Sequence, residues 1–199
     1  LPQIVEEGLS GGHMSEESGQ IIFECQGLYK SYNSTVALQN VNLKIASGGI
    51  IGLLGPNGSG KSTLIKLAMG LLQPTMGSIL VNGMRPSPAT KSITAYLPDV
   101  NFLPDWMRVE TAIPLYILDE PIAGVDPAAR DFILDIILSQ KPKDSTILLC
   151  THLISDIEPI LTHAVFLSRG QVVLDRDVRE VHEKEGKTLD ALFREVFRW

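Results

Sequence analysis

From residue 21 onward, short apolar runs alternate with segments of helical spacing. Residues 21–26 and 41–45 are predicted strands around a turn at residues 32–34, and residues 50–54 form a short apolar run containing a glycine and followed by another. The apolar positions of residues 61–72 recur at helical spacing. Residues 78–81 predict a strand that the turn pair Asn82-Gly83 closes. The pattern therefore predicts extended strands first, then a strand, a loop and a helix.

Two later apolar runs, residues 115–118 and 146–150, are continuous, which is typical of strands buried on both faces. Between them, Asp126-Pro127 predicts a helix start, because Asp caps a helix and Pro is tolerated at its first position. Apolar positions between residues 189 and 197 fall on one helical face. This alternation predicts a layered α/β domain with additional antiparallel strands at its start.

Composition favours a folded chain of one domain, or slightly more, with an acidic balance. The 199 residues hold 17 Lys+Arg against 23 Asp+Glu, a net charge of −6, and 44% of them are hydrophobic. This excess of acidic residues does not indicate the basic surface that nucleic-acid binding requires, so no nucleic-acid partner is expected. The longest charge-free stretch, residues 67–84, is broken by turn residues and does not predict a spanning helix. Without a recognisable signal peptide, a cytoplasmic location is expected.

Two smaller features complete this picture. Cys25 and Cys150 both lie in apolar runs, which predicts buried, reduced thiols rather than a disulfide. Residues 1–13 are glycine-rich, and Gly12-His13-Met14 resembles a cloning junction before a natural start. We therefore expect residues 1–13 to be vector-derived and residues 14–199 to form the domain.

The strongest chemical signal is a glycine-rich loop between the apolar run at residues 50–54 and the helical segment that follows. It matches the phosphate-binding pattern G-x-x-x-x-G-K-[ST]. Its backbone N–H groups would surround phosphate oxygens at a helix N-terminus, Lys61 would reach the β- and γ-phosphates, and Ser62 would ligate Mg²⁺. The alternative is a flexible loop that only caps a helix. The candidate nucleotide-binding residues are Gly55, Asn57, Gly58, Ser59, Gly60, Lys61, Ser62 and Thr63.

Two carboxylates follow the apolar run at residues 115–118. Asp119, at the end of a buried strand, is a candidate for holding Mg²⁺ through water. Glu120 is a candidate base or orienting group for an attacking water. Taken alone, the pair is also compatible with helix capping, but the phosphate loop and the turn at Pro121 favour a nucleotide site.

From about residue 21 to the C-terminus, the chain resembles an ATP-binding cassette (ABC) nucleotide-binding domain. Tyr32 resembles the aromatic residue that stacks on adenine, and Asp126 lies in a segment, residues 124–127, similar to the D-loop that meets a partner subunit. His152 resembles the switch histidine that contacts the γ-phosphate, while Asp99 stands where the family usually has a Q-loop glutamine that approaches the metal. Each residue also has a purely structural interpretation. Tyr32 could be a turn tyrosine packed on the first strands, His152 a surface histidine, and Asp99 a loop-capping aspartate.

The resemblance implies a P-loop core with a mostly parallel sheet and an N-terminal antiparallel subdomain, but one part of the family pattern is absent. Asp99 and Asp119 are only 20 positions apart, where the family inserts a helical subdomain carrying an LSGGQ-type signature. No such motif occurs between Thr63 and Asp119. Near residues 110–114 the residue pattern changes from the start of a predicted helix to the approach of a predicted strand. An omitted segment, a deletion, or a displaced signature at residues 9–12 would each explain this.

The function implied by the resemblance is ATP hydrolysis, with Mg²⁺, in a subunit that drives a membrane transporter of exporter type. Such subunits pair as homodimers or heterodimers, dock on membrane-spanning subunits and lie at the inner face of the membrane. Apolar residues after Asp99 (Phe102, Leu103, Trp106 and Met107) are either that docking surface or core of the missing subdomain. Two alternatives remain: a non-transport ABC ATPase of DNA repair or translation, and a P-loop kinase acting on a small acceptor.

Overall fold

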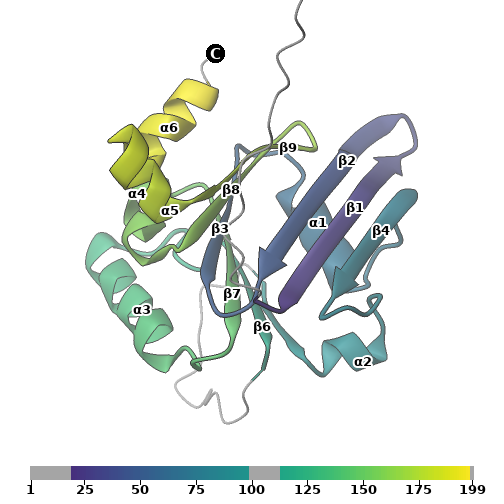
Figure 1. Cartoon of the computed structure of the whole chain (residues 1–199), viewed down its shortest axis with the longest axis horizontal. Helices are drawn as coiled ribbons and strands as arrows, with labels where there is room; N and C mark the ends of the chain where they lie inside the picture. Colours follow the sequence, from purple (N-terminus) through teal and green to yellow (C-terminus); the bar gives the residue numbers. More distant parts are fainter. Residues whose placement is uncertain (1–18, 99–112, 198–199) are drawn as a thin grey trace, which may run out of the picture.

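A computed structural model describes residues 19–98 and 113–197. The first part is an antiparallel sheet of three strands in the order β2-β1-β4, shown on the right of Figure 1. Its strands are β1 (Ile21–Tyr32), β2 (Thr35–Ala46) and β4 (Met76–Val81). The predicted antiparallel start of the domain is confirmed, and β1 and β2 run through to a tight turn at residues 33–34.

The second sheet holds six strands in the order β5-β6-β7-β3-β8-β9. Every neighbouring pair is parallel except β8 and β9, which form an antiparallel hairpin. The mostly parallel sheet expected of a P-loop core is therefore present. Its strands are β3 (Ile50–Leu54), β5 (Thr94–Leu97), β6 (Leu115–Asp119), β7 (Thr146–Thr151), β8 (His163–Ser168) and β9 (Gln171–Asp177).

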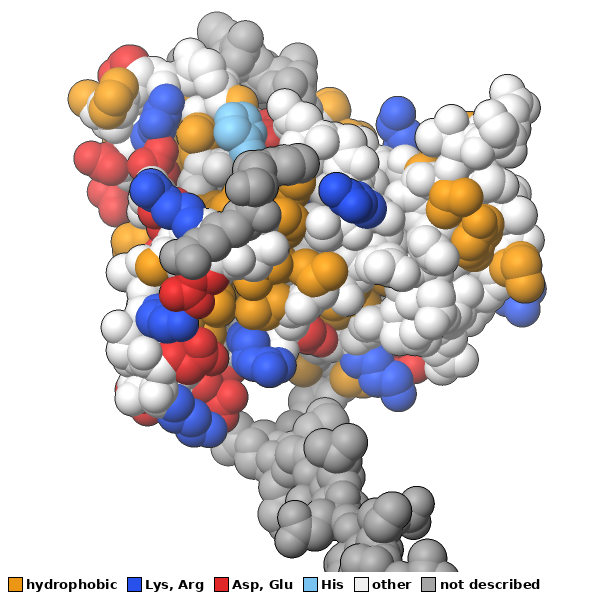
Figure 2. All heavy atoms as spheres, turned by 90° about the horizontal axis from the view of Figure 1, so that it is seen from above, with side chains coloured by type: hydrophobic (Ala, Val, Ile, Leu, Met, Phe, Trp, Pro, Cys, Tyr) orange, Lys and Arg blue, Asp and Glu red, His pale blue; other side chains and the backbone are white. Residues whose placement is uncertain are grey.

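Helices cover the six-stranded sheet on the side away from the antiparallel sheet, and α1 lies toward the antiparallel sheet (Figure 1). This helical side carries exposed ion pairs such as Lys184–Glu180 and Arg194–Asp190. Figure 2 shows acidic and basic side chains interspersed on the left of the molecule. The helical elements are α1 (Lys61–Ala68), α2 (Pro88–Lys91), α3 (Pro127–Gln140), α4 (Ile154–Ile157), η1 (Glu158–Ile160), α5 (Val178–Glu180), η2 (Val181–Glu185) and α6 (Leu189–Val196).

Two hydrophobic cores lie on opposite faces of the six-stranded sheet. Ile51 and Leu53 of β3 pack into the core shared with α1 and the antiparallel sheet. Ile50 and Leu54 of the same strand pack into the core shared with α3, α4 and α6. Because successive side chains of a strand point to opposite faces, a continuous apolar run is what a strand covered on both sides requires.

The helix expected over residues 61–72 is shorter than predicted. α1 ends at Ala68, and Gly70 has a left-handed backbone with φ 66°. Glycine adopts this conformation without strain and commonly ends helices, so the helical spacing after residue 68 continues without helical backbone.

Residues 1–13, Asp99 and most of the segment near residues 110–114 lie outside the described residues. Among the described helices, none combines the length and the apolar character needed to cross a membrane.

Candidate nucleotide site

The phosphate loop lies between the carboxyl end of β3 and the start of α1, as predicted. Gly60 precedes α1 with a left-handed backbone, φ 109°, and Gly58 has φ 78°. A Cβ atom on Gly60 would lie 2.6 Å from the carbonyl oxygen of Ala37 in β2. The loop thus needs glycine at position 60 both for its backbone angle and for the close approach of β2.

Lys61 is held inside this loop and is only 7% exposed. Its Nζ donates hydrogen bonds to the carbonyl oxygens of Gly55 at 2.6 Å and Pro56 at 3.3 Å. Burial lowers the pKa of Lys61, and the nearby carboxylates of Glu120 and Asp119 act in the opposite direction. The ammonium group therefore lies in the phosphate loop with two carboxylates close enough to influence it.

One further group suggests that the loop is built for a ligand. The Ser59 hydroxyl is buried and has no hydrogen-bond partner, while the Ser59 amide donates to the carbonyl of Pro56 at 3.1 Å. Buried polar atoms are usually paired, so this unpaired hydroxyl is one that a ligand in the loop could satisfy.

A cleft of about 360 Å³ joins the loop to the predicted carboxylates. This volume lies within the usual range of small-molecule sites. Chain segments that are far apart in the sequence form its walls. They are residues 57–63 of the loop and α1, residues 35–37 of β2, and Asp119 with Glu120. The structure thus brings together Asn57, Gly58, Ser59, Gly60, Lys61, Ser62, Thr63, Asp119 and Glu120, with Gly55 contributing its carbonyl to Lys61.

The carboxylates reach the cleft because β6 is parallel to β7 and pairs Asp119 with Cys150. Glu120 follows directly, with a left-handed φ of 50°, and its amide donates to the Cys150 carbonyl at 2.7 Å. Burial raises the pKa of the Cys150 thiol well above its ordinary value, so this cysteine is a neutral core residue. Cys25 is a second buried free cysteine, and the predicted reduced thiols are confirmed.

His152 lies beside Glu120 rather than alone at a strand end. Its Nδ1 is 3.0 Å from Oε1 and 3.1 Å from Oε2 of that carboxylate. Because an ionised carboxylate has no proton to give, Nδ1 carries the proton of this hydrogen bond. Nε2 is then the nitrogen that remains for a ligand.

Two other predicted residues lie outside the cleft lining. Tyr32 ends β1 next to the residues of β2 that line the cleft, is 42% exposed, and has the Lys30 ammonium 5.3 Å from its ring centroid. Asp126 caps α3, where its carboxylate accepts a hydrogen bond from the Ala129 amide at 3.1 Å. Their proposed contacts with nucleotide or a partner remain predictions.

The described residues contain no cluster of three or more His, Cys, Asp or Glu side chains that could hold a metal. Mg²⁺ does not need such a cluster, because it is usually bound through one or two carboxylates together with water and substrate phosphates. Ser62 and Asp119, both in the cleft lining, are a donor set that fits this ion.

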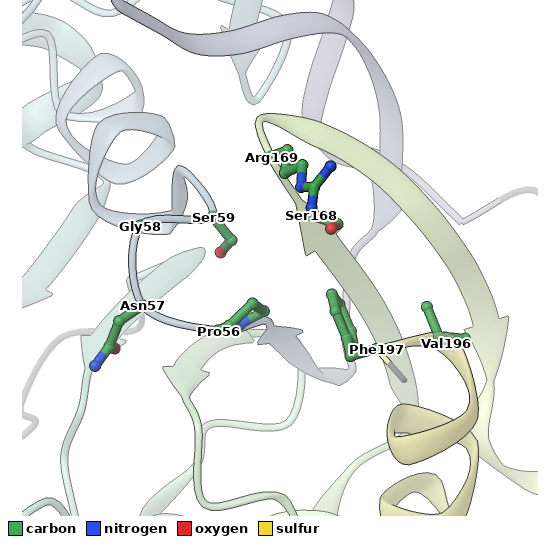
Figure 3. Close-up of a pocket in the computed structure, with 8 residues that line it drawn as sticks. All are labelled: Pro56, Asn57, Gly58, Ser59, Ser168, Arg169, Val196 and Phe197. Atoms are coloured by element: carbon green, nitrogen blue, oxygen red, sulfur yellow. The ribbon is translucent and has the colours of Figure 1, made fainter. Parts of the chain in front are cut away.

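A second cavity, of about 530 Å³, lies along the same loop (Figure 3). Residues 56–59 line it together with Ser168 and Arg169 at the end of β8 and with Val196 and Phe197 at the end of α6. The Gly170 amide also donates to the Ser59 carbonyl at 2.9 Å. The sequence did not predict this second cavity, because its walls at the ends of β8 and α6 carry no motif.

A glycine loop between a parallel strand and a helix, a buried lysine, and two carboxylates at the end of a nearby parallel strand define a P-loop nucleoside triphosphatase. Comparisons with known proteins identify the family within this class. A family model described as ABC transporter matches residues 38–111. The lantibiotic transport ATP-binding protein SrtF of Streptococcus pyogenes is 29% identical over 78% of this chain and 91% of its own length. A manganese transport system ATP-binding protein of Listeria monocytogenes is 37% identical over 53% of this chain and 41% of its own length.

Solved structures show the same fold. An ATP-binding subunit of an ABC transporter superposes with a TM-score of 0.73 at 24% identity, covering 89% of this chain and 100% of that one. A bacterial Atm1-family exporter with ATP bound gives a TM-score of 0.70 at 16% identity, over 89% of this chain and 42% of the exporter. The chain is an ABC nucleotide-binding domain, and domains of this family are ATPases.

Proposed function

We propose that this chain is the ATP-hydrolysing subunit of an ABC transporter and drives transport through membrane-spanning subunits. The observation that carries the proposal is the single cleft in which Lys61, Asp119 and Glu120 meet. The names of relatives support the transport role, since they include lantibiotic and manganese transport ATP-binding proteins. A peripheral position on the cytoplasmic face of the membrane follows from such a role.

The main polar groups of the cleft have distinct roles in this proposal. Lys61 and the loop amides bind the phosphates of ATP, and Ser62 and Asp119 would hold Mg²⁺, which supplies neutralising charge at the phosphates when bound. Glu120 orients water and accepts its proton. The water oxygen then bonds to the γ-phosphorus as the bond from phosphorus to the bridging oxygen breaks, which releases ADP and phosphate.

The test compares Glu120→Gln with its parent, both as the native protein. Glutamine keeps the shape of the side chain but cannot accept the proton, so hydrolysis should fall by about 10²-fold or more. ATP affinity, measured by titration calorimetry, should remain close to that of the parent. Glu183→Gln is the matched control, because Glu183 is an exposed carboxylate of η2, away from the cleft lining. Equal hydrolysis by Glu120→Gln and the parent would assign the catalytic role elsewhere, with His152 the next candidate.

We further infer that the native protein has a helical signature subdomain between β5 and β6. The alignment with SrtF spans 208 positions but only 78% of this 199-residue chain, so the relative holds residues that this sequence lacks. The intact mass of the native protein tests this inference. A mass well above 21.8 kDa supports it, and a mass of 21.8 kDa contradicts it.

A further inference from the structure

Glu120 is attached to β7 by both its backbone and its side chain. Its amide donates to the Cys150 carbonyl at 2.7 Å, and its Oε2 accepts a hydrogen bond from the Thr151 hydroxyl at 2.8 Å. The left-handed φ of 50° at Glu120 is unusual for a residue with a side chain. Such a conformation persists only where its surroundings hold it, and β7 supplies these contacts.

The direction of the Thr151 hydroxyl is fixed. The Leu153 amide donates to Thr151 Oγ1 at 3.1 Å, and a hydroxyl has one proton to give. That proton therefore points to Glu120. Thr151 has 0% exposure, so bulk water cannot take over either bond. A hydrogen bond from a hydroxyl to a carboxylate is among the stronger ones in proteins.

Together with His152, this hydroxyl defines how the Glu120 carboxylate is oriented. A carboxylate offers about four lone-pair positions. Thr151 takes one on Oε2, and His152 Nδ1 lies 3.0 Å from Oε1 and 3.1 Å from Oε2. The positions that remain are the ones available to a water molecule in the cleft.

We propose that Thr151 is a positioning residue for ATP hydrolysis, which acts by holding the Glu120 carboxylate in the orientation that receives the proton of the attacking water. This inference rests on the proposed function, because it assigns Glu120 the role of proton acceptor. Thr151 is fully buried and does not line the cleft, so it acts through Glu120. Its loss should therefore slow the reaction without weakening nucleotide binding.

The test uses Thr151→Val, which keeps the shape of the side chain and removes the hydroxyl, and it is made in the native protein that includes the inferred subdomain. Single-turnover hydrolysis of radiolabelled ATP, with protein in excess, should slow by about tenfold, as expected for a lost hydrogen bond to a charged group. The dissociation constant for ATP should change by less than about twofold, since no phosphate contact is lost. Thr151→Ser keeps the donor and should restore most of the rate.

Thr146→Val is the matched control. Thr146 lies on the same strand and is equally buried, but its hydroxyl accepts from the Gly48 amide at the other end of β7. This variant should hydrolyse ATP like the parent even where it lowers thermal stability. If Thr151→Val fails to fold, Thr151→Cys replaces it, because a thiol has a similar volume and is a much weaker donor.

Three results would overturn the role of Thr151. They are an unchanged rate in Thr151→Val, a rate in Thr151→Ser as low as in the valine variant, and a loss of ATP affinity equal to the loss of rate. If Glu120→Gln is slow while Thr151→Val is not, the role of Thr151 alone fails. If the parent binds ATP but its hydrolysis is insensitive to Glu120→Gln, the proposed catalytic role fails and this inference falls with it.

Discussion

Two glycines of the phosphate loop adopt backbone angles that residues with a side chain tolerate poorly. Gly58 and Gly60 both have left-handed backbones, but a Cβ atom at position 58 would meet nothing within 4 Å, whereas one at position 60 would lie 2.6 Å from the Ala37 carbonyl. A left-handed alanine costs about 1–2 kcal/mol. An overlap with well-packed neighbours adds about 1–3 kcal/mol.

Gly60→Ala should therefore destabilise the protein clearly more than Gly58→Ala. Urea unfolding of both variants and the parent measures the two free-energy changes, and Gly58→Ala is the control for the backbone angle alone. Equal losses of stability would mean that the approach of β2 to position 60 is not a constraint.

At this scale, sequence reasoning identified residues whose chemistry is tied to a short spacing. Lys61 and Glu120 were predictable because one belongs to a compact loop pattern and the other follows an apolar strand. Thr151 was not, because its contact with Glu120 depends on the pairing of β6 with β7 across 31 positions of sequence. Tyr32 was assigned by resemblance, and its role at the adenine ring remains a prediction.

At the scale of elements, α3 begins where local chemistry places it. The Asp126 carboxylate accepts a hydrogen bond from the Ala129 amide, and Pro127 occupies the first turn. Losing such a cap costs about 1 kcal/mol. Asp126→Ala should lower the unfolding free energy by about this amount, and Asp126→Ser should restore it.

Asp131→Ala is the matched control, since Asp131 is an exposed carboxylate within α3 rather than its N-cap. Calorimetric titration with ATP gives the second readout for the same variants. If Asp126→Ser is stable but binds ATP more weakly than the parent, Asp126 has a ligand role in addition to the cap.

Helices and strands were predictable where the hydrophobic pattern agrees with the residues that begin or end the element. The apolar run of β3 and the cap of α3 are examples of such agreement. The end of α1 was not predicted, because the apolar spacing continues past Gly70 while the backbone turns left-handed there. Helical spacing indicates which side chains could share a face, but a glycine with positive φ decides where the helix stops.

At the scale of the whole molecule, we expect two chains to share each ATP. In the family that this domain belongs to, each ATP is expected to lie between the cleft of one chain and the signature subdomain of the other. Such a contact is two-fold symmetric, so ATP that bridges the chains should drive association by mass action. A native Glu120→Gln protein that includes the subdomain should shift from monomer to dimer when ATP is added.

Sedimentation velocity with and without ATP measures this shift on protein of known mass. The 199-residue chain, which lacks the subdomain motif, is the control and should bind ATP yet stay monomeric. A tight ATP-dependent dimer of the 199-residue chain would contradict the proposed subdomain and redirect attention to residues 9–12.

The most direct test of the central claim is ATP binding by Lys61→Ala. Each hydrogen bond from a lysine ammonium to a phosphate is charge-assisted, so its loss should cost about 1.5–3 kcal/mol, a tenfold or larger loss of affinity. Lys66→Ala is the control, because Lys66 is an exposed lysine of the same helix outside the cleft lining. Titration calorimetry with Mg²⁺ and ATP should show weak binding for Lys61→Ala and parent-like binding for Lys66→Ala. Parent-like ATP binding by Lys61→Ala would contradict the assignment of this cleft as the nucleotide site.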